Sequence, residues 1–488
     1  MRSIKIKFTI KRFLIFSIIC HIIAVFFTEG FHRPDEHLGV INMMGHKLGI
    51  IPQSDLSWEY KAQIRTWLQP YIYLAIAKLY FLFEKNPFHL AFLLRLFSSI
   101  LGFYSILSLS KISYLLIKEE TINNFFKITL FSFWFFPFFH ARTTTENFST
   151  TFLILGIIPI IKFNLSENNK VVKESILSGI MLGFSYIFRF QSALAFCLPL
   201  LMTIKKGKQG KQFFFYSSVF IIILLLVNIY IDYLGHGELS FTTWNYFYQN
   251  LILKVANGFG TSPWYYYFSK TFLESGPPLG LFLVIAPILL LFYAPLNICN
   301  FIIWPFLIVH SLIGHKELRF IFPLLPFAIL SLFCLIEIKY ETIKKILCIK
   351  ILQIFIYLCC FLNLILLTIS IFRPAFGPIK MYKYMYYSNE EINNIYTLGV
   401  FRDQLRFYLK HPFTQTEINL SKSLNIIDEN SKSQTKAWFL TDHLNDRNRI
   451  LERSSCHEMY MSYPNWVFRF NYFNWINRSK TWSLIKCQ

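Results

Sequence analysis

Long apolar runs alternate with polar segments along the chain, and these runs have lengths that suit helices crossing a lipid bilayer. The clearest are Phe13–Phe27, the run that ends at Phe139, Phe213–Ile231, Leu279–Phe292, Phe320–Ile336 and Ile346–Ile371. The stretches Phe88–Ile117 and Ile176–Ile204 are each too long for one upright helix and too short for two, so the number of spans stays open. The pattern predicts an all-α polytopic membrane protein.

The distribution of charge assigns the polar segments to two sides of the membrane. Basic residues concentrate before Phe13 and again at Lys205–Lys211, and the positive-inside rule places both segments in the cytoplasm. Two long loops, residues 28–70 and 232–278, then fall on the opposite, outer face. We therefore predict that residues 1–372 form a multi-span membrane domain, with functional residues in its outer loops.

The composition changes after residue 372. Residues 373–488 are polar and aromatic and contain no run of spanning length. They are predicted to form a small soluble C-terminal domain on the outer side, which is the lumen or the periplasm. Cys456 and Cys487 lie in this domain, and they are able to pair if that side of the membrane is oxidising.

Composition and charge exclude several classes of protein. With 54% hydrophobic and 15% charged residues among 488, the chain is not a soluble multi-domain protein, a disordered chain or a secreted disulfide scaffold. The formal charge of +21 does not indicate nucleic acid as a partner. The basic residues are scattered through loops, where they orient spans and meet anionic membrane lipid or phosphate. The remaining cysteines lie in or beside apolar runs, and neither a metal site nor a cofactor is predicted.

Two adjacent carboxylates follow the first apolar run. The segment FHRPDEHLG places Asp35 beside Glu36, with two His and one Arg close by. A solvated acidic turn is the plainest interpretation of such a pair. However, Pro34 stiffens the approach, and the neighbouring basic side chains orient a carboxylate and tune its protonation, as a general base requires. Asp35 and Glu36 are therefore the candidate catalytic residues.

Basic and aromatic residues recur in both outer loops. The segment SWEYKAQIRTWLQP contains Arg65 and Trp67, and PWYYY in the second loop contains Trp264 and Tyr265. An Arg on the outer face runs against the positive-inside bias, so it requires an anionic partner. The aromatic residues suit a membrane-interface belt and the faces of sugar rings equally well, and both interpretations stay open.

The segment HKELRFIFPLLP carries His315, Lys316 and Arg319 at the mouth of an apolar run. If the segment is α-helical, spacings of three and four residues put the three side chains on one face. A charge cap on a helix end is the simpler interpretation. Cations on the outer face instead favour a phosphate-binding patch, at the depth where a lipid-linked phosphate ends. Arg142 and Arg189 are flanked by apolar residues and also require partners.

Together these segments resemble the Alg9-like mannosyltransferases, glycosyltransferase family 22. HRPDEH is similar to the HPDE-type motif of the family, with Arg33 inserted, and Gly39 stands where a Gln often follows. SWEYKAQIRTWLQP resembles a TWEW…RSWLHP stretch, PWYYY a PWYWY stretch, and HKELRFIFPLLP an HKExRFxxPxxP signature. The four motifs cover Phe31–Pro326 in family order. ARTTTEN and FRFQSAL are weaker matches, closest to the GPI mannosyltransferase III branch.

The resemblance implies a GT-C fold with its active site between the outer loops, in the endoplasmic reticulum membrane of a eukaryote or the cytoplasmic (inner) membrane of a bacterium. It implies transfer of mannose, with inversion, from a polyprenyl (dolichyl) phosphate mannose donor to a lipid-linked glycan acceptor such as a GPI precursor or an oligosaccharide. Such a transfer needs a base for the acceptor hydroxyl and cations for the departing phosphate. On this interpretation Asp35 is the base with Glu36 as alternate or orienting partner, His315, Lys316 and Arg319 hold the donor phosphate, and Arg65, Trp67, Trp264 and Tyr265 bind substrate.

Two other classes of protein remain as alternatives. A polytopic transporter or lipid flippase also carries charged groups at membrane depth. Transporters usually show paired halves, whereas here the unusual residues collect on one face and no repeat is visible. The second alternative is an adhesion or receptor protein that displays its C-terminal domain. That function does not explain the PDEH and HKELRF segments.

Overall fold

A computed structural model describes residues 2–165, 170–342, 350–388, 390–398, 405–433 and 436–487. The chain divides into two compact units. The membrane unit contains Met1–Met44, Gln53–Phe83 and Phe92–Arg373. The C-terminal unit contains Pro374–Gln488 together with two short segments, Gly45–Pro52 of the first outer loop and Glu84–Ala91 further along the chain.

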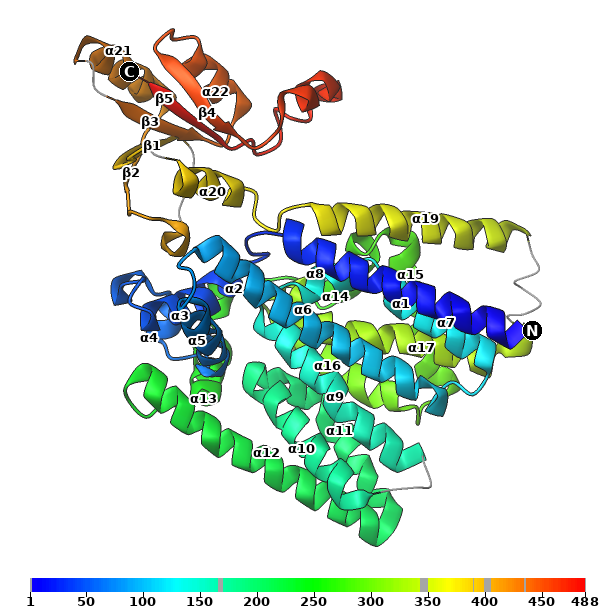
Figure 1. The fold of residues 1–488 in the computed structure, drawn as a ribbon. Coiled ribbons are helices and arrows are strands. Elements are labelled where there is room, and N and C mark those ends of the chain that lie inside the picture. The colour runs from blue at the N-terminus through cyan, green and yellow to red at the C-terminus, as the bar shows by residue number, and fades with distance from the viewer. Residues whose placement is uncertain are drawn as a thin grey trace. The chain divides into compact units, whose positions relative to one another are not determined.

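The membrane unit is built from long apolar helices (Figure 1). In the described part of the chain, seven helical segments are long and apolar enough to cross a membrane, which confirms a multi-pass membrane protein. They contain α1 (Arg2–Phe27), α6 (Pro87–Ile112), α9 (Thr145–Leu165), α10 (Val171–Phe188), α11 with α12 (Ala193–Met202 and Gly207–His236), α17 (Leu325–Ile338) and α19 (Lys350–Phe372). Two shorter apolar helices are α15 (Pro277–Tyr293) and α16 (Ile298–Leu312).

The structure resolves the spans that the apolar pattern left open. Phe88–Ile117 lies almost entirely in one helix, α6, which a short 3-10 turn continues. Ile176–Ile204 instead breaks at Arg189, whose backbone is extended between α10 and α11. The run ending at Phe139 is likewise divided, into α7 (Glu120–Ser132) and α8 (Phe135–His140). The apolar pattern did not predict these breaks because apolar residues flank each of them.

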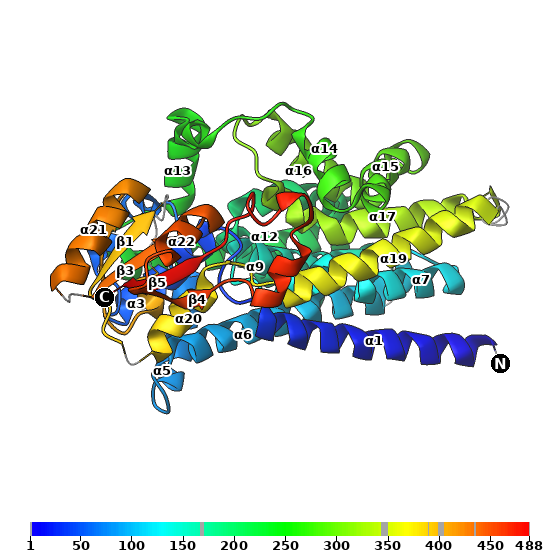
Figure 2. The same ribbon diagram turned by 90° about the horizontal axis from the view of Figure 1, so that it is seen from above.

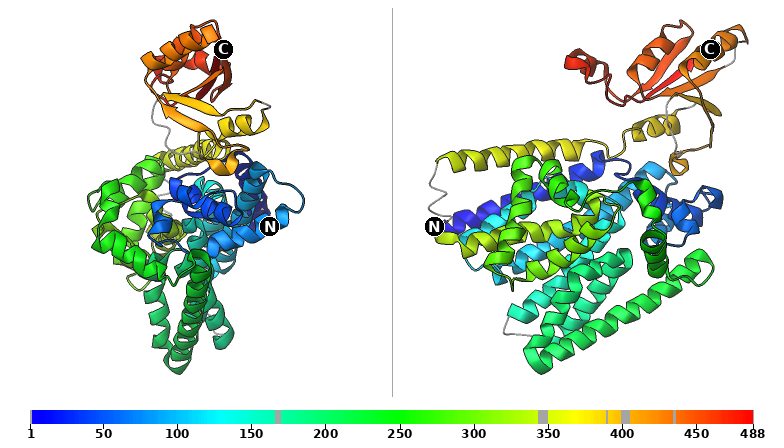
Figure 3. Two further views of the ribbon diagram at one scale, coloured as in Figure 1. Left: turned by 90° about the vertical axis from the view of Figure 1, so that its left-hand side faces the viewer. Right: turned by 180° about the vertical axis from the view of Figure 1, so that it is seen from behind.

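Close helix contacts hold the membrane unit together. Helix α10 packs against α9 and α12, and the three run side by side (Figures 1 and 3). Glycines allow this approach: a Cβ on Gly156 would lie 2.5 Å from the Leu182 side chain, and one on Gly179 would lie 2.5 Å from the Ser217 carbonyl oxygen. Helices α1 and α19, from the two ends of the unit, also lie side by side (Figures 1 and 2).

Both outer loops fold into short helices. The first contains α2 (Pro34–Glu36), a π-helical turn (His37–Ile41), α3 (Asn42–Lys47) and α4 (Trp58–Lys61), and it leads into α5 (Leu68–Tyr80). The second contains α13 (Thr242–Phe247) and α14 (Tyr266–Glu274). The π-helical turn follows the predicted carboxylate pair directly, and such turns often occur at functional sites.

The C-terminal unit contains a mixed five-stranded sheet with the strand order β2-β1-β3-β5-β4. The strands are β1 (Asn394–Leu398), β2 (Thr414–Glu417), β3 (Ala437–Thr441), β4 (Cys456–Met461) and β5 (Ser483–Cys487), and the helices are α20 (Ile379–Tyr387), α21 (Leu420–Ser433) and α22 (Leu444–Leu451). Strand β1 is parallel to β2 and β3, whereas β5 is antiparallel to β3 and β4. A disulfide joins Cys456 to Cys487 across β4 and β5, so the two cysteines left open by the sequence are paired.

One contact fixes the first outer loop to α12. The ring of Trp67 is fully buried against Gly235, where an added Cβ would lie 2.0 Å from the ring carbon Cγ. The backbone N–H of Trp67 donates to the buried carboxylate of Asp232 at 2.7 Å. Because Arg65 is two residues before Trp67, this contact also positions Arg65.

We expect Gly235→Ala to destabilise the membrane unit, because the methyl group has no room beside Trp67. Overpacking of this kind costs about 1–3 kcal/mol. Thermal unfolding of the full chain in one detergent measures the effect. Gly258→Ala is the matched control, since nothing lies within 4 Å of a Cβ there. Equal unfolding temperatures for the two variants would contradict the expectation.

Candidate active site

Three segments far apart in the sequence meet at the carboxylate of Asp35. Asp35 lies on α2, which starts with Pro34 in its first turn, where the absent N–H of proline costs nothing. Its Oδ2 accepts a hydrogen bond from Arg65 Nη2 at 2.8 Å and lies 2.7 Å from Arg319 Nη2. Arg65 belongs to the segment before α5, and Arg319 to a 3-10 helix, Leu318–Leu324, that leads into α17. One carboxylate therefore joins the PDEH, IRTW and HKELRF segments.

Each of the two guanidinium groups has a second carboxylate partner. Arg65 donates to both oxygens of Glu59, at 3.0 and 2.7 Å. Arg319 donates in the same bidentate manner to Glu317, at 2.9 and 2.8 Å. These pairs keep the buried guanidinium groups charged and hold their planes in fixed directions.

A further pair extends the network into the helices. Glu146, at the start of α9, forms an ion pair with Arg189 at the break between α10 and α11. The same carboxylate lies 3.7 Å from Arg319 Nη1. We call Asp35, Glu59, Arg65, Glu146, Arg189, Glu317 and Arg319 the charge network. An Arg at membrane depth requires an anionic partner. The sequence did not indicate the partner of Arg189, and the structure shows that it is Glu146.

Asp35 is ionised in this environment. Burial alone would raise the pKa of its carboxyl group, but the guanidinium groups of Arg65 and Arg319 outweigh burial and hold the pKa well below its usual range. Its side chain keeps 30% of its surface accessible, more than Arg65 or Arg319. Asp35 is thus held in its ionised form and is the most accessible carboxylate of the network, since Glu317, the next, keeps 21% of its side-chain surface accessible.

Glu36 points the other way and is almost fully buried. Its carboxylate accepts hydrogen bonds from the backbone N–H of His32 at 2.8 Å and from the backbone N–H of Thr143 at 2.7 Å. The Thr143 hydroxyl adds a third bond at 3.0 Å, and Arg142 lies 3.9 Å away. These contacts tie α2 to the segment before α9, so the geometry favours Glu36 as the residue that holds Asp35 in place.

The HKELRF segment is not α-helical: His315–Glu317 are irregular, and a 3-10 helix begins at Leu318. The three cations therefore do not share the face of an α-helix. Nζ of Lys316 donates to the carbonyl oxygens of Ser262 and Ile313. Nδ1 of His315 lies 2.8 Å from the carbonyl oxygen of Gly260. His315 and Lys316 thus bind the second outer loop, whereas Arg319 contacts Asp35.

Glu317 is the residue of this segment whose role the sequence did not indicate. The Glu317 carboxylate pairs with the guanidinium of Arg319. Its oxygens also lie 3.4 Å from His315 Nε2 and 3.7 Å from Arg33 Nε. The need of a buried Arg for an anionic partner predicts that such carboxylates exist, but it does not single out Glu317 or Glu146 from the sequence. Each carboxylate of the charge network has a guanidinium partner. Among the described residues, no group of three or more His, Cys, Asp or Glu side chains could hold a metal ion.

The aromatic candidates fall into two groups. Trp67 is buried against α12, so its ring has no surface left for a substrate in this conformation. Trp264 and Tyr265 precede α14 and are exposed, with their rings in edge contact at 5.8 Å. Of these three aromatic candidates, Trp264 and Tyr265 are the ones whose rings are exposed.

Two adjoining hollows lie beside the charge network. A small polar hollow of about 40 Å³ is lined by Arg65, Arg189 and neighbouring polar groups, including Thr145, Gln191 and Tyr246. A larger, mostly apolar hollow of about 430 Å³ lies between α10, α12 and α13. The two share Phe190, Thr242 and Thr243. The two hollows therefore adjoin each other, and the smaller one is lined by two guanidinium groups.

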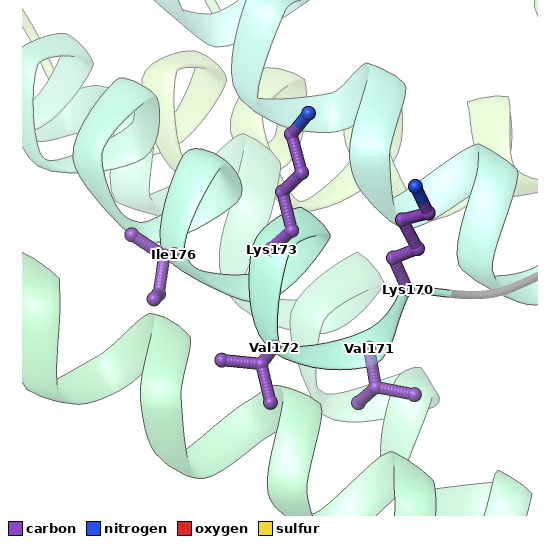
Figure 4. A pocket seen from close by; sticks show the side chains of 5 residues that line it. All are labelled: Lys170, Val171, Val172, Lys173 and Ile176. Atoms are coloured by element: carbon purple, nitrogen blue, oxygen red, sulfur yellow. The ribbon is translucent and has the colours of Figure 1, made fainter.

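Another hollow, of about 580 Å³, lies at the opposite end of α10 (Figure 4). Lys170, Val171, Val172, Lys173 and Ile176 line it, and in Figure 4 the two lysine side chains point away from the valines. It lies away from the charge network, and the described residues that line it include no carboxylate.

The fold is that of a GT-C membrane glycosyltransferase. ArnT from Cupriavidus metallidurans, in a crystal structure bound to undecaprenyl phosphate, is similar with a TM-score of 0.56, covering 97% of each chain at 10% sequence identity. Its apo structure is similar with a TM-score of 0.55, covering 98% of each chain at 10% identity. At this identity the likeness shows the fold alone, and it confirms the GT-C prediction.

A model of the Alg9-like mannosyltransferase family matches residues 12–406, and the chain belongs to this family. GPI alpha-1,2-mannosyltransferase 3 of Bos taurus is 26% identical over 328 residues, which cover 66% of this chain and 58% of the relative. GPI mannosyltransferase 3 of Debaryomyces hansenii is 27% identical over 305 residues, which cover 59% and 52%. The chain thus spans less than two thirds of the length of these relatives. The family resemblance is confirmed, and the transporter alternative is set aside.

We expect Glu36→Gln to destabilise the protein, because a neutral amide accepts more weakly from the two backbone N–H groups and brings a donor that the site does not need. Disrupting such buried, charge-assisted bonds costs about 1–3 kcal/mol. Thermal unfolding of the purified chain measures it. Glu274→Gln, in an exposed pair with Lys270, serves as control and should change little. A variant of normal stability that lacks turnover would instead make Glu36 a catalytic residue.

Proposed function

We propose that this protein is a membrane mannosyltransferase that moves mannose from a polyprenyl (dolichyl) phosphate mannose donor to a lipid-linked glycan acceptor. The observation that carries the proposal is the ionised carboxylate of Asp35 held between the guanidinium groups of Arg65 and Arg319. This arrangement puts a proton acceptor directly beside an anion-binding site. An inverting glycosyl transfer from a lipid phosphate requires both.

In the proposed step, the acceptor hydroxyl attacks the anomeric carbon of mannose from the face opposite the phosphate. Asp35 accepts the hydroxyl proton as the new C–O bond forms. The bond from the anomeric carbon to the phosphate oxygen breaks, and the phosphate leaves with the electron pair. The configuration at the anomeric carbon is therefore inverted, and the products are the mannosylated acceptor and the polyprenyl phosphate.

Arg319 is the proposed main contact of the donor phosphate. Its Nη1 is buried and has no hydrogen-bond partner among the described residues, so it offers an N–H to an incoming oxygen. A phosphate bound to Nη1 leaves the contact of Asp35 with Nη2 in place and brings a second negative charge close to that carboxylate. A neighbouring like charge raises the pKa of a carboxyl group towards its usual range, so Asp35 becomes a better base. Donor binding and activation of the base are thus linked in this proposal.

The remaining candidates take supporting roles. His315 and Lys316 hold the second outer loop next to the phosphate site through Gly260 and Ser262. Arg65 and Arg189 line the polar hollow, and the adjoining apolar hollow of about 430 Å³ is large enough for part of an isoprenoid chain. Trp264 and Tyr265 offer exposed rings to a sugar.

Family membership supports mannose as the sugar, and the GPI mannosyltransferase 3 relatives support a GPI precursor as the acceptor. The endoplasmic reticulum membrane is the location that this acceptor implies. The test is incubation of the purified chain in nanodiscs with polyprenyl phosphate mannose and a panel of lipid-linked acceptors. Mass analysis should find one added hexose on a GPI precursor. Release of polyprenyl phosphate without any glycosylated acceptor would reject the proposal.

We expect Asp35→Asn to abolish transfer while leaving folding intact, because the amide keeps the shape of the side chain and removes its basicity. Loss of a general base lowers the rate by about a hundredfold or more. Turnover in nanodiscs measures the effect, with Asp55→Asn, an exposed residue of the same loop, as control. Near-normal turnover of Asp35→Asn would place the base elsewhere.

We expect Arg319→Ala to weaken use of the donor and not of the acceptor, because the phosphate loses a charge-assisted bond. The apparent KM for donor should rise about tenfold to a hundredfold. Arg319→Lys should recover only part of the loss, since Lys keeps the charge without the planar fork. The measurement is steady-state kinetics with each substrate varied separately, with Lys270→Ala as an exposed control. A change confined to the acceptor KM would refute the assignment.

A further inference from the structure

The segment that joins β4 to β5 presents aromatic rings to the outside of the C-terminal unit. We call residues 462–482 the aromatic loop. In Figure 1 it is the red segment that projects from the end of the sheet. Its exposed rings are those of Trp466, Phe470, Tyr472, Phe473 and Trp475. Phe473 is 94% exposed, which is unusual for so apolar a side chain.

The aromatic loop is folded around its own hydrogen bonds. The side chain of Asn471 accepts from the backbone N–H of Ile476 at 2.9 Å and donates to Asn477 at 2.8 Å. Arg478 donates to the carbonyl oxygen of Phe473 at 3.0 Å. Ile476, in the same loop, is fully buried. The loop thus holds its rings outward in a defined arrangement.

The backbone at the tip of the loop is strained. Phe473 has a φ angle of 57° and Asn474 one of 55°, in the left-handed region. Asn tolerates this region, but an aromatic residue there costs on the order of 1–2 kcal/mol. Neither the strain nor the exposed ring benefits the folding of the unit itself. Both therefore indicate a contact outside the unit.

The charges of the aromatic loop suit a lipid surface. The segment contains Arg469, Arg478 and Lys480 and no Asp or Glu. Lys480 pairs with Asp442, whereas Arg469 and Arg478 are exposed beside the rings. Rings of Trp, Tyr and Phe with neighbouring cations are typical of segments that lie in the headgroup region of a bilayer.

The chain itself keeps this surface near a bilayer. Helix α19, a candidate span, ends at Phe372, and the C-terminal unit begins at Pro374. So short a link keeps the unit close to the membrane surface. The effective concentration of lipid around the unit is therefore high, and even a weak contact with lipid forms for much of the time. We propose that the aromatic loop inserts its rings into the headgroup region and fixes the C-terminal unit on the membrane.

The test measures where the tip of the loop lies in the full chain reconstituted in nanodiscs. Cys197, Cys348 and Cys360 are first replaced by Ser, and a polarity-sensitive fluorophore is attached to Phe473→Cys. The matched control is Ser421→Cys, an exposed polar position on α21 in the same unit. The label at 473 should show blue-shifted emission and quenching by brominated lipid, and the label at 421 should show neither.

A second variant separates lipid contact from folding. Phe473→Asn suits the left-handed backbone, so the unfolding temperature should be equal or higher, while lipid quenching of a label at Trp466→Cys should fall. Emission at 473 equal to that at 421 overturns the proposal. So does a label at 473 that is shielded from iodide yet insensitive to brominated lipid, because the loop then docks on protein. These outcomes do not depend on mannose transfer.

Discussion

The contact between the carboxylate of Asp35 and the guanidinium groups of Arg65 and Arg319 is the interaction on which the site depends. Each of the three residues comes from a different part of the chain, and each guanidinium has a second carboxylate, Glu59 or Glu317. Because Glu59 and Glu317 remain as partners, neutralising Asp35 leaves neither guanidinium unpaired, whereas loss of a guanidinium leaves buried carboxylates with fewer partners. The network thus joins two segments of the first outer loop to the 3-10 helix that leads into α17.

The surroundings of the network explain how loops provide a rigid site. Glu36 ties α2 to Thr143, and Asp232 and Gly235 of α12 hold Trp67 next to Arg65. The break at Arg189 delivers a further guanidinium from the membrane helices. Loops normally move more than helices, but here the segments that carry Asp35 and Arg65 are bonded, close to these side chains, to Thr143 just before α9 and to Asp232 of α12.

Much of this arrangement could be predicted from the sequence, for identifiable reasons. The apolar runs predicted the membrane helices. Asp35 and Arg319 could be singled out because charged side chains beside a membrane span need a partner or a function. The pairing of Glu146 with Arg189 could not be predicted, since it depends on how α9 and α10 pack. Trp67 was misleading because a buried tryptophan and an interfacial one look alike in a sequence. The engagement of Lys316 by carbonyl oxygens depends on a backbone that is not α-helical there.

The position of β5 in its sheet has a consequence for synthesis. Strand β5, Ser483–Cys487, lies between β3 and β4 and pairs with both. While the ribosome is still translating the segment before Ser483, β3 and β4 have no strand between them, and Cys456 has no partner thiol. A chain that stops just before Ser483 would thus contain the described membrane helices but lack β5, and its exposed strand edges and free thiol are features that chaperones and oxidoreductases bind.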